Sequence, residues 1–133
     1  MLTIGLEGEL SVEVTLANTA RTMGSGELDV FATPAMVALM EATASRSLIP
    51  FMEEDSGTVG ISINIRHIAV TPVGMTVYCK SKLVEINQKR LVFSVAAFDV
   101  CGLIGEGTHE RFIVDNVKFF NKACKKKEAE IHD

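Results

Sequence analysis

The sequence lacks tryptophan, has a single tyrosine, and contains only three cysteines among its 133 residues. Cys79, Cys101 and Cys124 are odd in number and widely spaced, and they form no CxxC or Cys/His pattern. This argues against a disulfide scaffold or a metal site and predicts reduced thiols in a cytoplasmic protein. The core must therefore use aliphatic residues and the seven phenylalanines, and a single domain of this length can bury such a core unaided.

Long apolar runs and an excess of basic charge are also missing. No apolar stretch approaches the ~20 residues of a membrane span, and residues 1–7 lack the charged and apolar regions of a signal peptide. The net charge of −4 argues against a nucleic-acid partner. The one basic run, Lys125 to Lys127, precedes Glu128 and Glu130, and we interpret it as a solvated end. We therefore expect neither nucleic acid nor membrane as a partner.

Hydrophobic periodicity predicts one strand and one long helix in the first half. Apolar and polar residues alternate over residues 7–16, which predicts a strand with one buried face. Residues 18–26 are small and polar, which predicts a loop, with at most one helical turn, that could cover a site. Thr33 and Pro34 suit the N-cap and first position of a helix that runs to about Phe51. Its apolar residues occupy more than one side, so we expect it to be mostly surrounded by protein.

The sequence pattern of the second half predicts four strands joined by tight turns. These strands are expected at residues 59–67, 75–86, 91–99 and 103–115. Tight turns require antiparallel neighbours. One strand, a long helix and four more strands can bury one another if the sheet curls around the helix, which is an α+β architecture of the hotdog type. We expect one domain over residues 1–133, with short irregular structure or a helical turn from Asn116 onward and a flexible tail at 122–133.

Few residues could carry chemistry, because the sequence has no G-x-S-x-G elbow, glycine-rich phosphate loop or metal-ligand cluster. Glu41 is the lone carboxylate in an otherwise uncharged run, where it is either exposed, paired with an arginine, or functional. Thr33 is explained as a helix cap, yet a helix N-terminus also favours negative charge. Eight residues separate the two, about 12 Å along a helix, so they could meet only through a second chain or a third group.

Two histidines lie in predicted strands. His67 ends the strand that begins at Val59, on the face of Val59, Ile61 and Ile65 if no bulge intervenes. A histidine there is either structural or part of a site. His109 lies beside Glu110 and Arg111 in the last strand and has the same two interpretations.

Three segments resemble one known family in order and spacing: ATPAMVALMEATASR at 32–46, RHIAVTPVGMTV at 66–77, and GEGTHERFIV at 105–114. The chain resembles the fluoroacetyl-CoA thioesterase family of the hotdog superfamily over about residues 12–121. The resemblance implies hydrolysis of an acyl-CoA thioester by a catalytic set of Thr33, Glu41 and His67. It places Gly60 near the thioester carbonyl and Arg111 near the bound substrate. It also implies a homodimer of side-by-side sheets, and we expect no metal or other cofactor, since CoA belongs to the substrate.

One segment departs from the family. Residues 23–27 contain no aromatic side chain, whereas the fluoroacetyl-specific enzyme carries phenylalanines in a lid there. We therefore expect another small or medium acyl group. In this scheme His67 activates a water or the Thr33 hydroxyl, and Glu41 acts as general base or nucleophile. The alternatives are a non-catalytic protein that binds acyl-CoA or a small hydrophobic ligand, and a dehydratase of the same fold.

Overall fold

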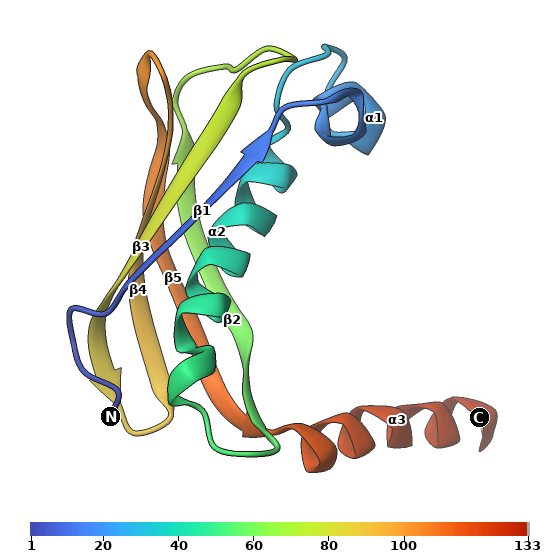
Figure 1. Cartoon of the computed structure of the whole chain (residues 1–133). Coiled ribbons are helices and arrows are strands. Elements are labelled where there is room, and N and C mark those ends of the chain that lie inside the picture. Colours follow the sequence, from blue (N-terminus) through green and yellow to red (C-terminus); the bar gives the residue numbers. More distant parts are fainter. Residues whose placement is uncertain (133) are drawn as a thin grey trace.

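The computed structural model describes residues 1–132, and the chain forms a curled antiparallel sheet around one long helix (Figure 1). The strands are β1 (Glu7–Glu13), β2 (Ser56–His67), β3 (Thr76–Asn87), β4 (Arg90–Asp99) and β5 (Gly102–Asp115). The helices are α1 (Ala20–Met23), α2 (Thr33–Leu48) and α3 (Asn116–His132), with 3-10 turns at Leu16–Asn18 and Ile49–Phe51. The sheet order is β1-β3-β4-β5-β2, and all neighbours are antiparallel. The predicted α+β hotdog fold is confirmed.

The core lies between α2 and the inner face of the sheet. Met36, Met40 and Leu48 of α2 are almost completely buried. Alternate residues of the central strands meet them, because successive side chains of a strand point to opposite faces; these residues are Val77, Cys79, Leu83, Leu91, Phe93 and Val95. This packing fixes which part of α2 lies beside which strand, and so it determines where the candidate site residues lie.

The edge strand β2 contains an irregularity that the sequence pattern did not predict. Its pairing register with β5 shifts between Gly60 and Ser62, which marks Ile61 as the bulged residue. Ile61 is 52% exposed, whereas Ile63 and Ile65 pack against the core. The expectation that Ile61 shares the buried face of His67 is therefore wrong, because the bulge intervenes.

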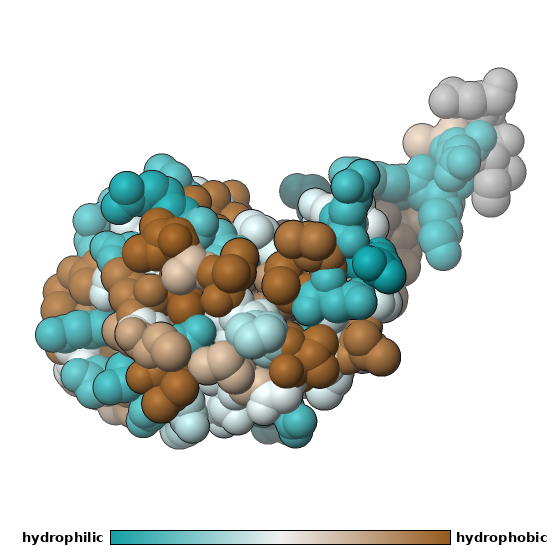
Figure 2. All heavy atoms as spheres, turned by 90° about the horizontal axis from the view of Figure 1, so that it is seen from above, coloured by the Kyte–Doolittle hydropathy of each residue, from teal (hydrophilic) through white to brown (hydrophobic). Residues whose placement is uncertain are grey.

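The expectation of irregular structure beyond Asn116 is also wrong, since α3 follows β5 directly and projects from the body (Figures 1 and 2). The Asp115 side chain accepts a hydrogen bond from the Lys118 amide at 3.0 Å, as a helix cap does. Lysine, glutamate and alanine, which favour helices, predominate from residue 122 onward. The predicted flexibility of the tail stays a prediction, and residue 133 lies outside the described residues. Within residues 1–132, no helix has the length and apolar character to cross a membrane.

The core position of Met40 gives a test of this packing. Met40 is fully buried and Met23, in α1, is 45% exposed. Met40→Ala should lower the free energy of unfolding by about 2–5 kcal/mol, because it removes buried methylene groups and leaves a cavity. Met23→Ala should change it by less than about 0.5 kcal/mol. Urea unfolding measures both, and equal losses would contradict the assignment of the core.

Candidate active site

Thr33 and His67 form a hydrogen-bonded pair at one end of the molecule. Thr33 Oγ1 and His67 Nδ1 lie 2.8 Å apart. The helix begins at Thr33, and its N-cap is Ala32, which provides no side-chain cap. The prediction that Thr33 is the N-cap is therefore wrong by one residue. Because Thr33 already lies inside the first turn, its hydroxyl is free to meet the histidine.

His67 is half-buried at the end of β2. Burial lowers the pKa of its imidazole below the ordinary value of 6.5, and a polar contact with the Ala69 backbone opposes this shift only partly. The ring is therefore neutral near pH 7 and can accept a proton. A hydroxyl within hydrogen-bond reach of a neutral imidazole is the arrangement of an activated nucleophile and its base.

A second group of residues surrounds Glu41, about two turns further along α2. A side chain at Gly60 would place its β-carbon 2.8 Å from Glu41 Oε2 and 3.2 Å from His109 Cε1. Because glycine has no β-carbon, a pocket of about 260 Å³ opens there, lined by Glu41, His109 and residues 60–63. The Glu41 side chain is 42% exposed, so its carboxylate is accessible from this pocket.

Arg111 points at Glu41 from β5. Its Nη1 lies 3.8 Å from Glu41 Oε2, a loose ion pair. The rest of the guanidinium is held by Thr58, whose hydroxyl accepts from Nε at 2.8 Å and whose carbonyl accepts from Nη2 at 3.0 Å. Burial lowers the pKa of the Arg111 guanidinium and the charge of Glu41 opposes this shift, and the group stays charged at neutral pH. This places a fixed positive charge beside the pocket.

His109 completes this second group, and the sequence did not single it out as functional. Its ring lies beside Phe93, and its Nε2 lies 3.1 Å from Arg111 Nη1. Burial is the main cause that lowers the pKa of His109, and the charge of Arg111 adds to it. Side chains alternate along β5, so residues 109, 111 and 113 share one face, on which Ile113 is partly buried. Two polar side chains, His109 and Arg111, on such a face are the sequence signal that points to His109.

The five predicted site residues thus fall into two groups within one chain. Thr33 and His67 lie together, and Glu41, Gly60 and Arg111 lie together. Gly60 and His67 are both in β2 and seven residues apart, which is about 23 Å along a strand. We call these two groups half-sites; one lies at the His67 end of β2 and the other beside the middle of that strand.

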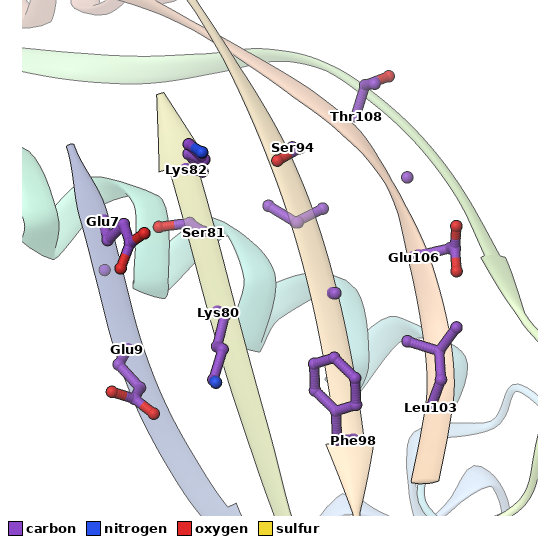
Figure 3. A pocket seen from close by; sticks show the side chains of 14 residues that line it. Glu7, Glu9, Lys80, Ser81, Lys82, Ser94, Phe98, Leu103, Glu106 and Thr108 are labelled. Atoms are coloured by element: carbon purple, nitrogen blue, oxygen red, sulfur yellow. The ribbon is translucent and has the colours of Figure 1, made fainter. Parts of the chain in front are cut away.

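A larger hollow of about 860 Å³ lies on the outer face of the sheet (Figure 3). Lys80, Lys82, Ser94 and Phe98 line it, on the face away from α2. It contains none of the five predicted residues. No cluster of three or more metal-binding side chains occurs in the described part of the chain.

Comparison with known proteins identifies the family. The model of the fluoroacetyl-CoA-specific thioesterase family matches residues 14–117. The fluoroacetyl-CoA thioesterase of Streptantibioticus cattleyicolor is 40% identical over 101 residues, which covers 76% of this chain and 73% of that protein. A crystal structure of the fluoroacetyl-CoA thioesterase superposes with a TM-score of 0.89 at 34% identity, covering 95% of this chain and 98% of that one.

A hypothetical protein of the thioesterase superfamily from Thermus thermophilus superposes with a TM-score of 0.90 at 28% identity, covering 98% and 97% of the two chains. The chain is a thioester hydrolase of the hotdog fold, as the resemblance implied. It belongs to the fluoroacetyl-CoA-specific thioesterase family.

The two histidines predict how stability depends on pH. Both have pKa values lowered below 6.5 in the folded chain, so below pH 6.5 the unfolded chain binds protons that the folded chain does not. The free energy of unfolding should therefore fall as the pH drops below 6.5, by up to about 1.4 kcal/mol per histidine at pH 5.5. Urea unfolding at pH 7.5 and 5.5 measures the loss.

His109→Gln isolates the contribution of His109 to the pH dependence of the free energy of unfolding, because the variant and the wild type have the same carboxylates. The variant should lose less stability than the wild type between the two pH values. An identical loss would contradict a depressed pKa at His109.

Proposed function

We propose that this protein hydrolyses small or medium acyl-CoA thioesters with Thr33, Glu41 and His67 as its catalytic set. The observation that carries the proposal is the 2.8 Å hydrogen bond between Thr33 Oγ1 and the neutral His67 ring. A threonine hydroxyl is a weak nucleophile until a base takes its proton, and His67 is placed to do so.

The acylation step uses this pair. Thr33 Oγ1 attacks the thioester carbonyl while His67 Nδ1 takes the hydroxyl proton. The C–S bond then breaks, and the CoA thiolate leaves with the proton from His67. Backbone N–H groups of the first turn of α2 and of Gly60 are the available donors for the developing oxyanion.

Glu41 serves the second step. As general base it deprotonates a water, which attacks the Thr33 ester; the C–O bond breaks, and the proton passes from Glu41 to the Thr33 oxygen. Arg111, 3.8 Å from the carboxylate, keeps Glu41 oriented without a tight ion pair. Gly60 leaves the room in which this water and the acyl carbonyl lie.

The acyl group is small or medium in size. The pocket beside Glu41 has a volume of about 260 Å³, enough for a short chain. A variant of the fluoroacetyl-CoA thioesterase is described in complex with acetyl-CoA. The segment between α1 and Phe31 has no aromatic side chain, and its residues through Asp29 are exposed. An aromatic lid selective for fluoroacetyl is therefore missing from residues 23–30, and we assign this protein a substrate other than fluoroacetyl-CoA.

The working form is a homodimer in which two β2 strands pair side by side. β2 is a 12-residue strand at the edge of the sheet, and an unpaired edge is a template for another strand. Ile61, Ile68 and Val70, on β2 and just beyond it, are 52%, 53% and 70% exposed.

Antiparallel pairing about a two-fold axis near Asn64 joins the two half-sites. Because the strands run in opposite directions, the His67 end of one chain then lies against the Gly60 end of the other. Thr33 and His67 of one chain would face Glu41, Gly60 and Arg111 of its partner. This explains why residues of one catalytic set lie two helical turns apart within a chain.

We place the protein in the cytoplasm. Cys79 is buried, Cys101 and Cys124 are exposed, and all three are free thiols in the described structure. Unpaired exposed cysteines suit a reducing compartment, where acyl-CoA is available as the substrate. We propose no cofactor, since the CoA moiety arrives with the substrate.

Glu41→Gln tests the mechanism, with Glu106→Gln on the outer face of the sheet as a matched control. Turnover of an acyl-CoA panel, followed as release of free thiol, should fall by about 10²–10⁴ in Glu41→Gln because the deacylation base is lost. Glu106→Gln should keep the wild-type rate. Intact-mass spectrometry of Glu41→Gln should show an acyl group retained on Thr33.

Three results would go against this account. Near-normal turnover by Glu41→Gln would remove Glu41 from the catalytic set. Lost turnover without an adduct would favour Glu41 as the nucleophile. Tight CoA binding by the wild type with no thiol release on any substrate would favour the non-catalytic binding protein.

The dimer has its own test. Sedimentation should give about twice the 14.4 kDa of one chain. Asn64→Glu places two like charges opposite each other at the two-fold axis and should weaken the dimer at least tenfold, with turnover falling as dimers dissociate. Ser11→Glu, on the opposite edge strand β1, should leave both unchanged. A wild-type monomer with full activity would refute the shared site.

A further inference from the structure

His109 is a buried ionisable side chain that the proposed mechanism does not use. It is 1% exposed, yet it lies at the wall of the pocket that holds Glu41. A buried polar side chain usually has its hydrogen bonds satisfied, so the identity of its partners indicates its role. Both ring nitrogens of His109 have such partners.

The partners fix the tautomer. Nδ1 lies 2.8 Å from the carbonyl oxygen of Ser62, which can only accept, so Nδ1 carries the proton and donates it. Nε2 lies 3.1 Å from Arg111 Nη1, which can only donate, so Nε2 is the acceptor. A neutral ring with one proton on Nδ1 satisfies both contacts, and a doubly protonated ring would repel Arg111.

A neutral acceptor at this position has a particular consequence for Arg111. Its guanidinium is buried, with only 8% of the side chain exposed, and needs acceptors on its N–H groups. Thr58 supplies two and His109 supplies the third, and none of these groups carries a negative charge. The positive charge is thus held in place without being neutralised. Glu41, at 3.8 Å, is the nearest carboxylate and remains free to react.

We propose that His109 is a positioning residue: as a neutral acceptor it holds Nη1 of Arg111 toward Glu41 and the pocket. It does not touch the substrate, and it acts through Arg111. The backbone hydrogen bond to Ser62 fixes the ring, and Ser62 follows the bulge beside Gly60, so the same irregularity in β2 shapes the pocket and orients the histidine. This inference rests on the proposed catalytic role of Glu41.

Two isosteric variants separate positioning from packing. In His109→Asn the side-chain amide reaches the position of Nδ1 and keeps the Ser62 bond, but it leaves Arg111 Nη1 without its acceptor. In His109→Gln the amide oxygen reaches the position of Nε2 and keeps the Arg111 contact. We expect kcat to fall about tenfold or more in His109→Asn, with KM little changed, and to stay within about threefold of wild type in His109→Gln.

The Arg111→Lys background shows whether His109 acts through Arg111. Once the guanidinium is absent, His109→Asn should lower kcat no further, so the two changes should be strongly non-additive. Full additivity would overturn the proposal. The proposal would also be overturned if His109→Asn and His109→Gln lost kcat equally and each loss of kcat paralleled the loss of stability in that variant.

The wild-type protein supplies a readout that needs neither a folded variant nor activity. ¹⁵N NMR of the imidazoles should show His109 neutral at pH 7, with its proton on Nδ1 and an accepting Nε2, and the Arg111 Nε–H protected from exchange. A proton on Nε2, or a charged ring, would overturn the proposal whether or not the protein hydrolyses thioesters. If the NMR result holds and thiol release fails, the proposed function fails and the positioning of Arg111 stands.

Discussion

The packing of α2 into the concave face of the sheet is the constraint on which the site depends. Met36, Met40 and Leu48 hold the helix at one depth and one rotation against β3 and β4. The same rotation turns Thr33 toward the end of β2 and Glu41 toward its middle. Close packing leaves α2 little freedom to shift, so the core packing sets the geometry of the candidate site. At Gly60, where a β-carbon would lie 2.8 Å from Glu41 Oε2, a missing side chain makes the pocket.

Electrostatics then distinguish the two half-sites. His67 is neutral because it is partly buried, and it lies beside a hydroxyl, which suits transfer of one proton. The other half-site holds a permanent cation, Arg111, in a shell of neutral acceptors, with a carboxylate at its open side. Burying a charge without a tight counter-ion is costly. A buried arginine without a tight counter-ion does not stabilise the fold, so the arrangement is typical of a functional site.

Much of the fold could be predicted from the sequence because its signals are local. Period-two alternation predicts β1 and β2, tight-turn signals delimit β3, β4 and β5, and the Ala-, Met- and Leu-rich segment before Pro50 predicts α2. Thr33 was misplaced by one residue because a threonine before a proline has the same pattern at the cap and inside the first turn. The helical tail gives no such signal, because residues 116–130 are all exposed and no core sets their pattern. The bulge at Ile61 depends on pairing with β5, which no single strand encodes. Thr33, Glu41 and His67 were proposed together only because their spacing resembles a family, and His109 needed the side-chain contacts that the fold creates.

The central claim is that one active site combines Thr33 and His67 of one chain with Glu41 of its partner, and subunit mixing tests it most directly. His67→Ala and Glu41→Gln chains, each inactive alone, are refolded together in equal amounts, and thiol release from an acyl-CoA is compared with wild type. In a mixed dimer one of the two sites receives an intact His67 and an intact Glu41. Random pairing therefore predicts recovery of about a quarter of the wild-type rate. A mixture no more active than the sum of its two inactive components would contradict the shared site.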